Sequence, residues 1–337
     1  MVYNLPMART LYPAVGIVAL FSLCKIGSSQ TPSSGPLVSI IPRPSPSVVL
    51  NPDSVPSEHL RVDASMVLVP VHAVSAAGAN VTDLAAANFR VFEDGVEQKI
   101  TYFSQDDAAL SVGLVFDSSG SMSNKIRKSA NAAAAFFKTA NTGDEFFLVE
   151  FGERPKLLLP FTSNSDEVYQ KIAHTKAFGR TPLIDAIHLA LIQMKNARNS
   201  RKAIVILSDG GDNRSRLTRG QIKGALLESD VQLYAMGIFD AGDLLKHSRE
   251  EQNGPRLLDE LAEHTGGRVY TIDNLDDLES ISSQLGTALR SEYLLGYMPS
   301  NPSRNGKYRH IKVDLAVSPK AAIPNISYRR GYYAPVE

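Results

Sequence analysis

The sequence predicts a doubly wound α/β domain with a mostly parallel sheet between residues 109 and 292, and flanking β-rich segments. Short apolar runs alternate along this part of the chain with amphipathic helical stretches, and polar or glycine-rich turns bound each run. A strand that connects through a helix to a parallel neighbour crosses over with a right hand, which covers both faces of the sheet with helices. The alternation therefore indicates one sheet between two layers of helices.

Five apolar runs are the expected strands of this sheet, namely residues 112–116, 146–151, 203–207, 231–238 and 268–272. The expected helices have apolar residues three and four apart and span 126–140, 183–197, 221–227, 257–264 and 275–289. Residues 156–161 are expected to add an antiparallel edge strand, because only a short turn through Gly152 separates them from the strand before.

The two flanking units, residues 57–108 and 293–337, have the composition of β-strands. Strands are expected at 65–74, 89–103, 293–298, 308–317 and 326–333, and Asp94-Gly95 favours a tight hairpin turn within the second. The three C-terminal strands are too few to form a stable domain alone. We therefore expect strands from both ends of the chain to pair in one β-sandwich.

The first 29 residues have the pattern of a signal peptide. Arg9 precedes an apolar run at 11–23 that ends in small polar residues. The run is shorter than the roughly 20 residues of a membrane-spanning helix. An uncleaved anchor stays open, as does lipidation of Cys24, although Leu23 stands where bacterial lipoproteins usually have a small residue. We expect a periplasmic, cell-envelope or secreted protein in which Pro- and Ser-rich residues 30–56 form a linker.

Composition and missing motifs exclude several functions. Thirty-five basic residues balance 35 acidic ones without a long basic run, so nucleic acid is not an expected partner. The single cysteine excludes a disulfide framework or a Cys-rich zinc site within one chain. The chain lacks a nucleophile elbow, a zinc-protease helix, a P-loop and a dinucleotide fingerprint. We therefore expect no catalytic activity, and no small-molecule substrate is evident.

Oxygen-bearing side chains follow two of the expected strands and precede one helix. Asp117, Ser119 and Ser121 come after the first run, Asp209 comes after the run at 203–207, and Thr181 precedes the helix from 183. Ligands of open α/β sheets bind at the carboxyl ends of the strands, where these loops meet. Oxygen ligands without a nearby histidine or thiol suit a hard cation such as Mg²⁺, with Mn²⁺ as a substitute.

These five residues resemble the metal-ion-dependent adhesion site of the von Willebrand factor A (VWA) family, which combines Asp-x-Ser-x-Ser with a distant Thr and a distant Asp. All five positions match in order, and the resemblance covers roughly residues 111–290. It implies that Ser119 and Ser121 coordinate one cation directly and that Thr181 does so when ligand is bound. Asp117 and Asp209 would act largely through water. The motif does not choose firmly between Mg²⁺, Mn²⁺ and Ca²⁺.

Other stretches are similar to bacterial proteins called VWFA-related, described mainly from acidobacteria. They are residues 89–95, 201–203, 208–215 and 331–335. Arg180 departs from the pattern, because related loops often have glycine there, and it places a bulky cation beside Thr181. Lys125, Arg127 and Lys128 are expected on a solvated helix face. Asp212 is expected in an exposed loop, with a role as an outer-shell carboxylate of the metal as the alternative.

The resemblance implies a divalent-cation-dependent protein-binding module for adhesion or envelope assembly. An acidic side chain of a protein partner would complete the oxygen shell of the cation. One alternative is a structural envelope scaffold that the metal stabilises. A metal-dependent hydrolase is less expected: in haloacid-dehalogenase phosphatases the strand-end Asp is followed two residues later by a second acid, and Ser119 stands there in this chain.

Overall fold

A computed structural model describes residues 66–336 except 77, 106, 210, 239–252 and 317–323. The expected signal peptide at 1–29 and the linker at 30–56 lie outside the described residues. Among the helices that are described, none is both long and apolar enough to cross a membrane.

The expected α/β domain is present. Its six-stranded sheet has the order β10 (Val269–Ile272), β9 (Gln232–Ile238), β8 (Arg201–Ser208), β5 (Leu110–Asp117), β6 (Glu145–Phe151) and β7 (Lys156–Thr162). All neighbours are parallel except β6 and β7, which pair antiparallel as predicted for an edge strand. The sequence prediction of fold class is therefore confirmed.

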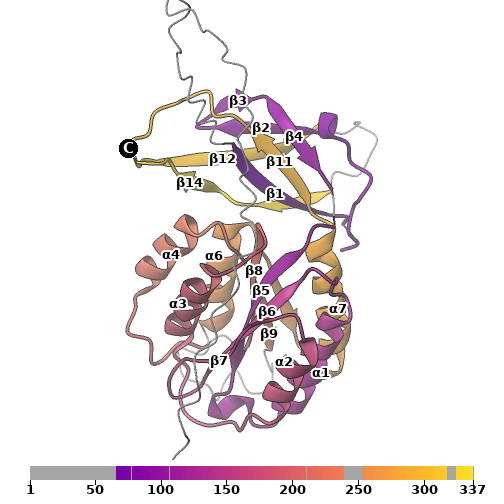
Figure 1. The fold of residues 1–337 in the computed structure, drawn as a ribbon, viewed down its shortest axis with the longest axis vertical. Helices are drawn as coiled ribbons and strands as arrows, with labels where there is room; N and C mark the ends of the chain where they lie inside the picture. Colours follow the sequence, from indigo (N-terminus) through magenta and orange to yellow (C-terminus); the bar gives the residue numbers. More distant parts are fainter. Residues whose placement is uncertain are drawn as a thin grey trace, which may run out of the picture. The chain divides into compact units, whose positions relative to one another are not determined.

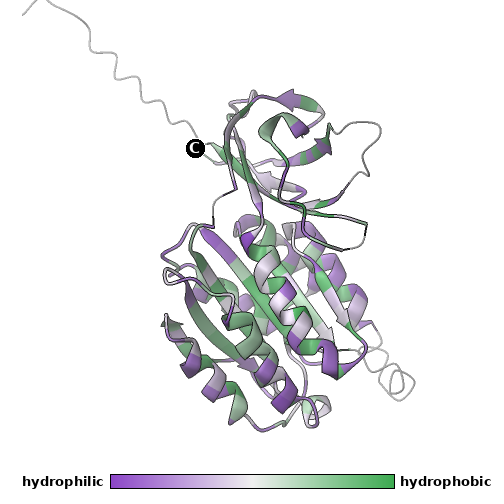
Figure 2. Ribbon diagram, turned by 90° about the vertical axis from the view of Figure 1, so that its right-hand side faces the viewer, coloured by the Kyte–Doolittle hydropathy of each residue, from purple (hydrophilic) through white to green (hydrophobic). Residues whose placement is uncertain are grey.

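Helices cover both faces of this sheet (Figure 1). On one face lie α1 (Ile126–Phe137), α2 (Ser165–Ala173) and α7 (Leu278–Arg290), and on the other α3 (Leu183–Met194), α4 (Arg219–Glu228) and α6 (Gly254–Thr265). Short 3₁₀ turns are η1 (Ala86–Asn88), η2 (Gly120–Met122) and η3 (Leu275–Asp277). Figure 2 shows largely green, hydrophobic strands in this sheet and helices in which hydrophobic and hydrophilic residues alternate.

The central strand β5 is buried along its whole length, which explains why its sequence is a continuous apolar run. Gly113 lies in the middle of this strand, where a Cβ atom would stand 2.2 Å from Cζ of Phe147. The missing side chain therefore lets the Phe147 ring pack directly against β5. The helix α2 was not predicted, because its nine residues include few apolar positions and bury only Val168 and Ile172.

The strands from the two ends of the chain pair as predicted. One sheet has the order β13 (Asn325–Tyr328), β1 (Val67–Val74), β11 (Tyr293–Tyr297) and β4 (Ile100–Ser104). The other has the order β14 (Gly331–Tyr333), β12 (Tyr308–Leu315), β2 (Phe89–Glu93) and β3 (Val96–Gln98). Side chains from both sheets share one apolar core. The result is a β-sandwich.

The single strand predicted at 326–333 is wrong, because the structure divides it into β13 and β14 in different sheets. The chain changes sheets at Arg329 and Arg330, whose side chains pair with Asp230 and Glu263. Gly331 then packs against β12 so closely that a Cβ atom would stand 2.3 Å from the carbonyl oxygen of Arg309. Close packing between β14 and β12 therefore requires glycine at this position.

A buried polar cluster joins the two sheets of the sandwich at Glu93. Its carboxylate accepts hydrogen bonds from the hydroxyl groups of Tyr297 at 2.7 Å and Tyr332 at 2.8 Å, and from the Arg309 guanidinium at 2.9 Å. Burial and the hydrogen bond to Glu93 raise the pKa of Tyr332 to about 12. The sequence stretches around Glu93 and Tyr332, far apart in the chain, therefore meet in one hydrogen-bond network.

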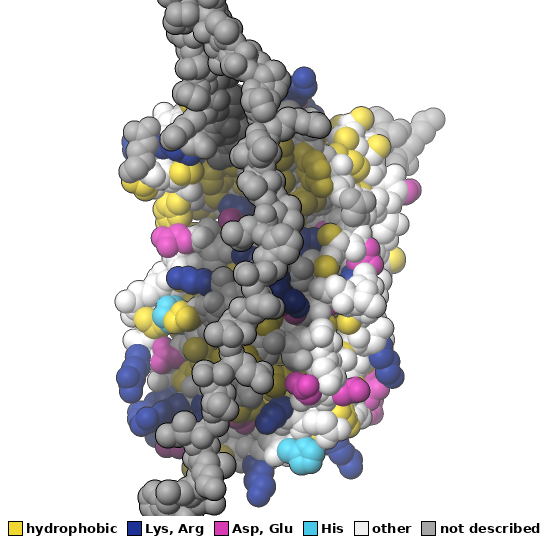
Figure 3. Space-filling model, viewed as in Figure 1, with side chains coloured by type: hydrophobic (Ala, Val, Ile, Leu, Met, Phe, Trp, Pro, Cys, Tyr) yellow, Lys and Arg dark blue, Asp and Glu magenta, His cyan; other side chains and the backbone are white. Residues whose placement is uncertain are grey.

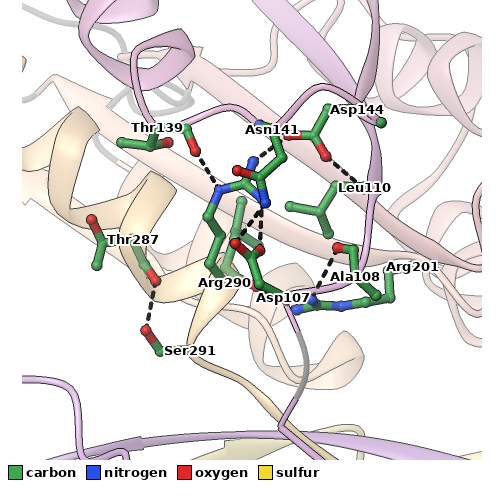
Figure 4. A network of polar contacts seen from close by, with 12 residues as sticks. Asp107, Ala108, Leu110, Thr139, Asn141, Asp144, Arg201, Thr287, Arg290 and Ser291 are labelled. Atoms are coloured by element: carbon green, nitrogen blue, oxygen red, sulfur yellow. Dashed lines mark hydrogen bonds and ion pairs between the residues drawn. The ribbon is translucent and has the colours of Figure 1, made fainter.

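A second polar cluster lies at the amino ends of the parallel strands (Figure 4). Arg290, the last residue of α7, donates hydrogen bonds to the Thr139 carbonyl oxygen and to the side chains of Asp107 and Asp144. Asp144 also accepts from the backbone N–H of Leu110 at 2.8 Å. This cluster links the segment that leads from the sandwich into β5 with α7, the helix after which the chain returns to the sandwich.

We expect Glu93→Ala to lower the free energy of unfolding by about 3–5 kcal/mol, because it leaves the buried Arg309 cation without its carboxylate. Urea unfolding followed by circular dichroism measures the change. Glu97→Ala is the matched control, since Glu97 forms a solvent-exposed ion pair with Arg90 and its loss should change stability little. Equal effects of the two substitutions would contradict a stabilising role for the Glu93 cluster.

Candidate metal-binding site

The pairing of β5 with β8 brings two of the predicted site residues together. Asp117 is the last residue of β5, and Asp209 directly follows the last residue of β8. The two strands are parallel neighbours, with Phe116 opposite Leu207. Both carboxyl groups therefore lie at the same edge of the sheet, where Asp117 is fully buried and Asp209 is 9% exposed.

The loop after β5 is shaped by the Asp117 carboxylate. One oxygen accepts a hydrogen bond from the Ser119 backbone N–H at 2.8 Å, and the other accepts from the Ser208 hydroxyl at 2.5 Å. The chain then turns through η2, which places the hydroxyl oxygens of Ser119 and Ser121 3.0 Å apart. Two hydroxyls therefore stand beside each other on a loop that a buried carboxylate holds in place.

Thr181 joins this edge through backbone contacts of the loop before α3. Phe178 N–H donates to the Ser118 carbonyl at 2.7 Å, and Gly120 N–H donates to the Gly179 carbonyl at 3.3 Å. The backbone N–H of Thr181 donates to the Asn213 side chain at 3.0 Å, and Asn213 N–H donates back to the Thr181 carbonyl at 3.1 Å. Thr181 is 2% exposed, so all three loops meet around buried or half-buried oxygen atoms.

Gly179 is required for this arrangement. Its φ of +92° lies in the region that disfavours side chains, and a Cβ atom would stand 2.6 Å from the backbone nitrogen of Glu153. The loop before α3 therefore packs directly on the turn after β6 as well as on the loop after β5.

Asp209 has no hydrogen-bond partner among the described residues, although both of its carboxylate oxygens are buried. Its one ion-pair contact in this part of the chain is with Lys125, whose Nζ lies 3.7 Å from Oδ2. Lys125 is 6% exposed, so the prediction of a solvated position is wrong for this residue. Arg127 is exposed and Lys128 half-exposed, as predicted.

The position of Lys125 follows from helical spacing. It precedes α1 at the N-cap position and lies four residues before Ser129, which is fully buried. A four-residue spacing places both on the face of α1 that packs on the sheet. This spacing indicates a buried position for Lys125, but the charge of its side chain led to the prediction of a solvated one.

Three further residues support the site and were missed or misplaced by sequence reasoning. Ser208 donates a hydrogen bond to Asp117, and the Asn213 side chain accepts one from Thr181 N–H. Asp212, expected in an exposed loop, is half-buried and accepts a hydrogen bond from the Ser215 hydroxyl at 2.6 Å and a longer one from Ile184 N–H at 3.4 Å. Burial raises the pKa of Asp212. Asp212 therefore fixes the beginning of α3.

The two carboxyl groups influence each other. Burial, and then the negative charge of Asp209, raise the pKa of Asp117 to about 7, although hydrogen bonds from Ser208 and Ser119 oppose the shift. Two buried carboxylates with one lysine carry an excess of negative charge when both are ionised. A divalent cation would relieve this excess.

The donor set fits a hard divalent cation. It consists of three hydroxyls and two carboxylates, and an oxygen-only set of this kind suits Mg²⁺ or Mn²⁺. In the described part of the chain, no three His, Cys, Asp and Glu side chains gather where they could hold a metal. The role of the five residues in metal binding stays a prediction.

Residues 112–211 match the family model of the von Willebrand factor type A domain. The chain contains a VWA domain. An uncharacterized protein of Borreliella burgdorferi is 23% identical over 157 residues, which cover 41% of this chain and 45% of that protein. This chain thus spans less than half the length of that relative.

Solved structures also resemble the chain at low sequence identity. A von Willebrand factor type A protein from Catenulispora acidiphila is 12% identical, with a TM-score of 0.48, over 74% of this chain and 73% of its own. The conserved hypothetical protein BatB from Bacteroides thetaiotaomicron is 17% identical, with a TM-score of 0.43, over 54% of this chain and 100% of its own.

The raised pKa of Asp117 predicts how pH affects the VWA domain in the presence of a chelator. A carboxyl group whose pKa is higher in the folded than in the unfolded chain stabilises the fold fully below its ordinary pKa of 3.8, and this contribution is lost as the pH rises through about 7. We expect Asp117→Asn to raise the melting temperature at about pH 8 by several degrees, and to raise it less at about pH 5.5. Differential scanning calorimetry measures both.

Asp259→Asn is the control, because Asp259 is exposed on α6 and its substitution should have a small effect at either pH. A lower melting temperature for Asp117→Asn than for the unsubstituted protein at the higher pH would show that the hydrogen bonds to Asp117 outweigh the cost of its buried charge.

Proposed function

We propose that this chain is a metal-dependent protein-binding module. Its candidate metal site holds one divalent cation, preferably Mg²⁺. This cation binds an acidic side chain of a protein partner. The observation that carries the proposal is the convergence of Asp117, Ser119, Ser121, Thr181 and Asp209 at one edge of the sheet. An oxygen-rich edge with two buried carboxylates is suited to a hard divalent cation.

The five residues have different roles in this site. Ser119 and Ser121 supply neutral oxygens, and Thr181 supplies a third on a separate loop. Asp117 fixes the first loop through Ser119 N–H, and Asp209 contributes charge without accepting a hydrogen bond from any residue that the structure describes. When bound, the cation would supply an open coordination position for a carboxylate, because Mg²⁺ favours six oxygen ligands.

The surface around the site supports an acidic partner. The loops at 152–155, 174–182 and 211–218 lie beside the candidate metal site. Their exposed cations are Arg154, Lys176, Arg180, Arg214 and Arg216, and their exposed acid is Glu153. Within the described residues, none of these cations forms an ion pair. In Figure 3 Lys and Arg side chains lie at the lower end of the visible face, with Asp and Glu side chains among them. A basic rim on a chain without net charge favours an acidic partner.

Phe178 adds an apolar contact beside this rim. Its side chain is 68% exposed, while its backbone N–H is fixed to the Ser118 carbonyl of the metal-site loop. Exposed aromatic side chains on fixed backbone are suited to protein recognition. The partner segment that fits this surface has a carboxylate next to a bulky apolar side chain.

Export of the protein to the cell envelope or beyond is part of the proposal and rests on the apolar run at 11–23. A scaffold that the metal merely stabilises is the competing function. The two differ in whether an acidic ligand competes for the metal site.

We expect Mg²⁺ and Mn²⁺ each to bind one site of the chelator-treated protein, measured by titration calorimetry. Asp117→Ala and Asp209→Ala should weaken binding by about 10- to 100-fold. Asp259→Ala, on the exposed surface of α6, is the control. Binding that survives both site substitutions would place the metal elsewhere. Folded protein without saturable binding would refute the metal site.

Selection of displayed random peptides on the immobilised protein in Mg²⁺, with elution by EDTA, tests the partner chemistry. We expect the eluted peptides to be enriched in Asp or Glu beside an apolar residue. Phe178→Ser and Arg180→Ser should weaken their binding, and Lys99→Ser, on the sandwich surface, should not. Peptides without acidic residues would contradict the proposal. Metal-dependent stability without any EDTA-sensitive peptide binding would favour the scaffold.

A further inference from the structure

Lys125 places an ammonium group inside the candidate metal site. Its Nζ lies 3.7 Å from Oδ2 of Asp209, and the two side chains are 7% and 10% exposed. This contact differs from a surface ion pair, because solvent screens neither group effectively. A cation of the protein's own therefore stands next to a carboxylate that would also serve the metal.

The backbone holds Lys125 in this position. Its N–H donates to the Met122 carbonyl at 2.8 Å, and its own carbonyl accepts from Ser129 N–H at 2.9 Å. Met122, in the turn that carries Ser121, is fully buried. The lysine is therefore attached to the same turn as the metal-site hydroxyls and points its charge towards the other loop.

The environment of Asp209 explains why a lysine is favourable there. Both oxygens are buried, and neither accepts a hydrogen bond within the described residues. An ionised carboxylate in such surroundings is costly unless an opposite charge lies close by. Lys125 provides that charge, and a divalent cation bound between the same loops would provide it as well.

We propose that Lys125 is an internal cation that competes with the divalent metal for Asp209. In chelated protein its ammonium neutralises Asp209 and stabilises the fold. When metal binds, the two positive charges repel each other, so Lys125 keeps the metal affinity lower than the oxygen ligands alone would give. The two effects are linked, because metal binding is weakened by whatever part of the favourable contact between Lys125 and Asp209 is lost when the metal binds. This inference rests on the metal site of the proposed function.

The competition has a consequence for the partner. A site whose metal is held weakly is filled more completely when an acidic ligand adds a further oxygen to the cation. Metal and partner would then bind cooperatively, with each raising the affinity for the other by the same factor.

Lys125→Met tests the proposal, since methionine keeps an unbranched apolar stem and removes the charge. We expect the dissociation constant for Mg²⁺, measured by titration calorimetry, to fall about tenfold, within the range of typical coupling between sites. We also expect the melting temperature in EDTA to fall by several degrees. Lys128→Met is the matched control, because Lys128 lies on the same helix and pairs with the exposed Asp276. It should leave the Mg²⁺ affinity unchanged.

A double-substitution cycle identifies the interacting group. If Lys125 acts through Asp209, Lys125→Met should lower the melting temperature in EDTA much less in an Asp209→Asn background. Lys125→Gln serves as a second variant if Lys125→Met does not fold. Equal destabilisation in both backgrounds would overturn the proposed pairing.

The outcomes separate this inference from the proposed function. If the unsubstituted protein binds Mg²⁺ and Lys125→Met binds it equally well or more weakly, the proposed competition is overturned. The metal site itself is then still supported. No binding by either folded protein would overturn the metal site, and the competition with it. Binding by Lys125→Met that exceeds that of the unsubstituted protein supports both.

Discussion

The burial of two carboxyl groups at the ends of neighbouring parallel strands is the constraint on which the site depends. The pairing of β5 and β8 places Asp117 and Asp209 at one edge of the sheet. The cost of burying each carboxylate is offset in a different way. Asp117 receives hydrogen bonds from Ser119 and Ser208, whereas Asp209 receives the charge of Lys125. The loops after β5 and β8 adopt conformations that supply these hydrogen bonds and this charge.

The rest of the VWA domain keeps the opposite end of the sheet rigid. The chain enters β5 and leaves α7 at the amino ends of the strands, where Arg290 bonds Asp107, Asp144 and the Thr139 carbonyl (Figure 4). Glu292, which follows α7, accepts hydrogen bonds from Gln232 and Tyr234 at the beginning of β9. Both connections to the sandwich are therefore fixed at one end of the strands. The loops of the candidate metal site lie at the other end of the strands.

The sequence predicted the architecture because periodicity and strand burial are local properties. Continuous apolar runs marked the parallel strands, and the residues after them marked the edge where Asp117 and Asp209 meet. The division of 326–333 between two sheets could not be predicted, because it depends on ion pairs of Arg329 and Arg330 with residues distant in sequence. The helical spacing of Lys125 could have indicated its burial, but its pairing with Asp209 could not be predicted, because Asp209 lies on another loop that only the fold brings close.

Charge around the site is arranged in two zones that act over different distances. The arginines of the rim are exposed and unpaired in the described part of the chain, so their field reaches an approaching partner over roughly 10 Å at moderate salt. They affect mainly the rate of association. Lys125 is buried and acts on its immediate neighbours, so it affects what is bound at the edge of the sheet. An acidic partner of the proposed kind would therefore meet the basic rim first, and the balance of charge around Asp209 would then set the strength of the final contact.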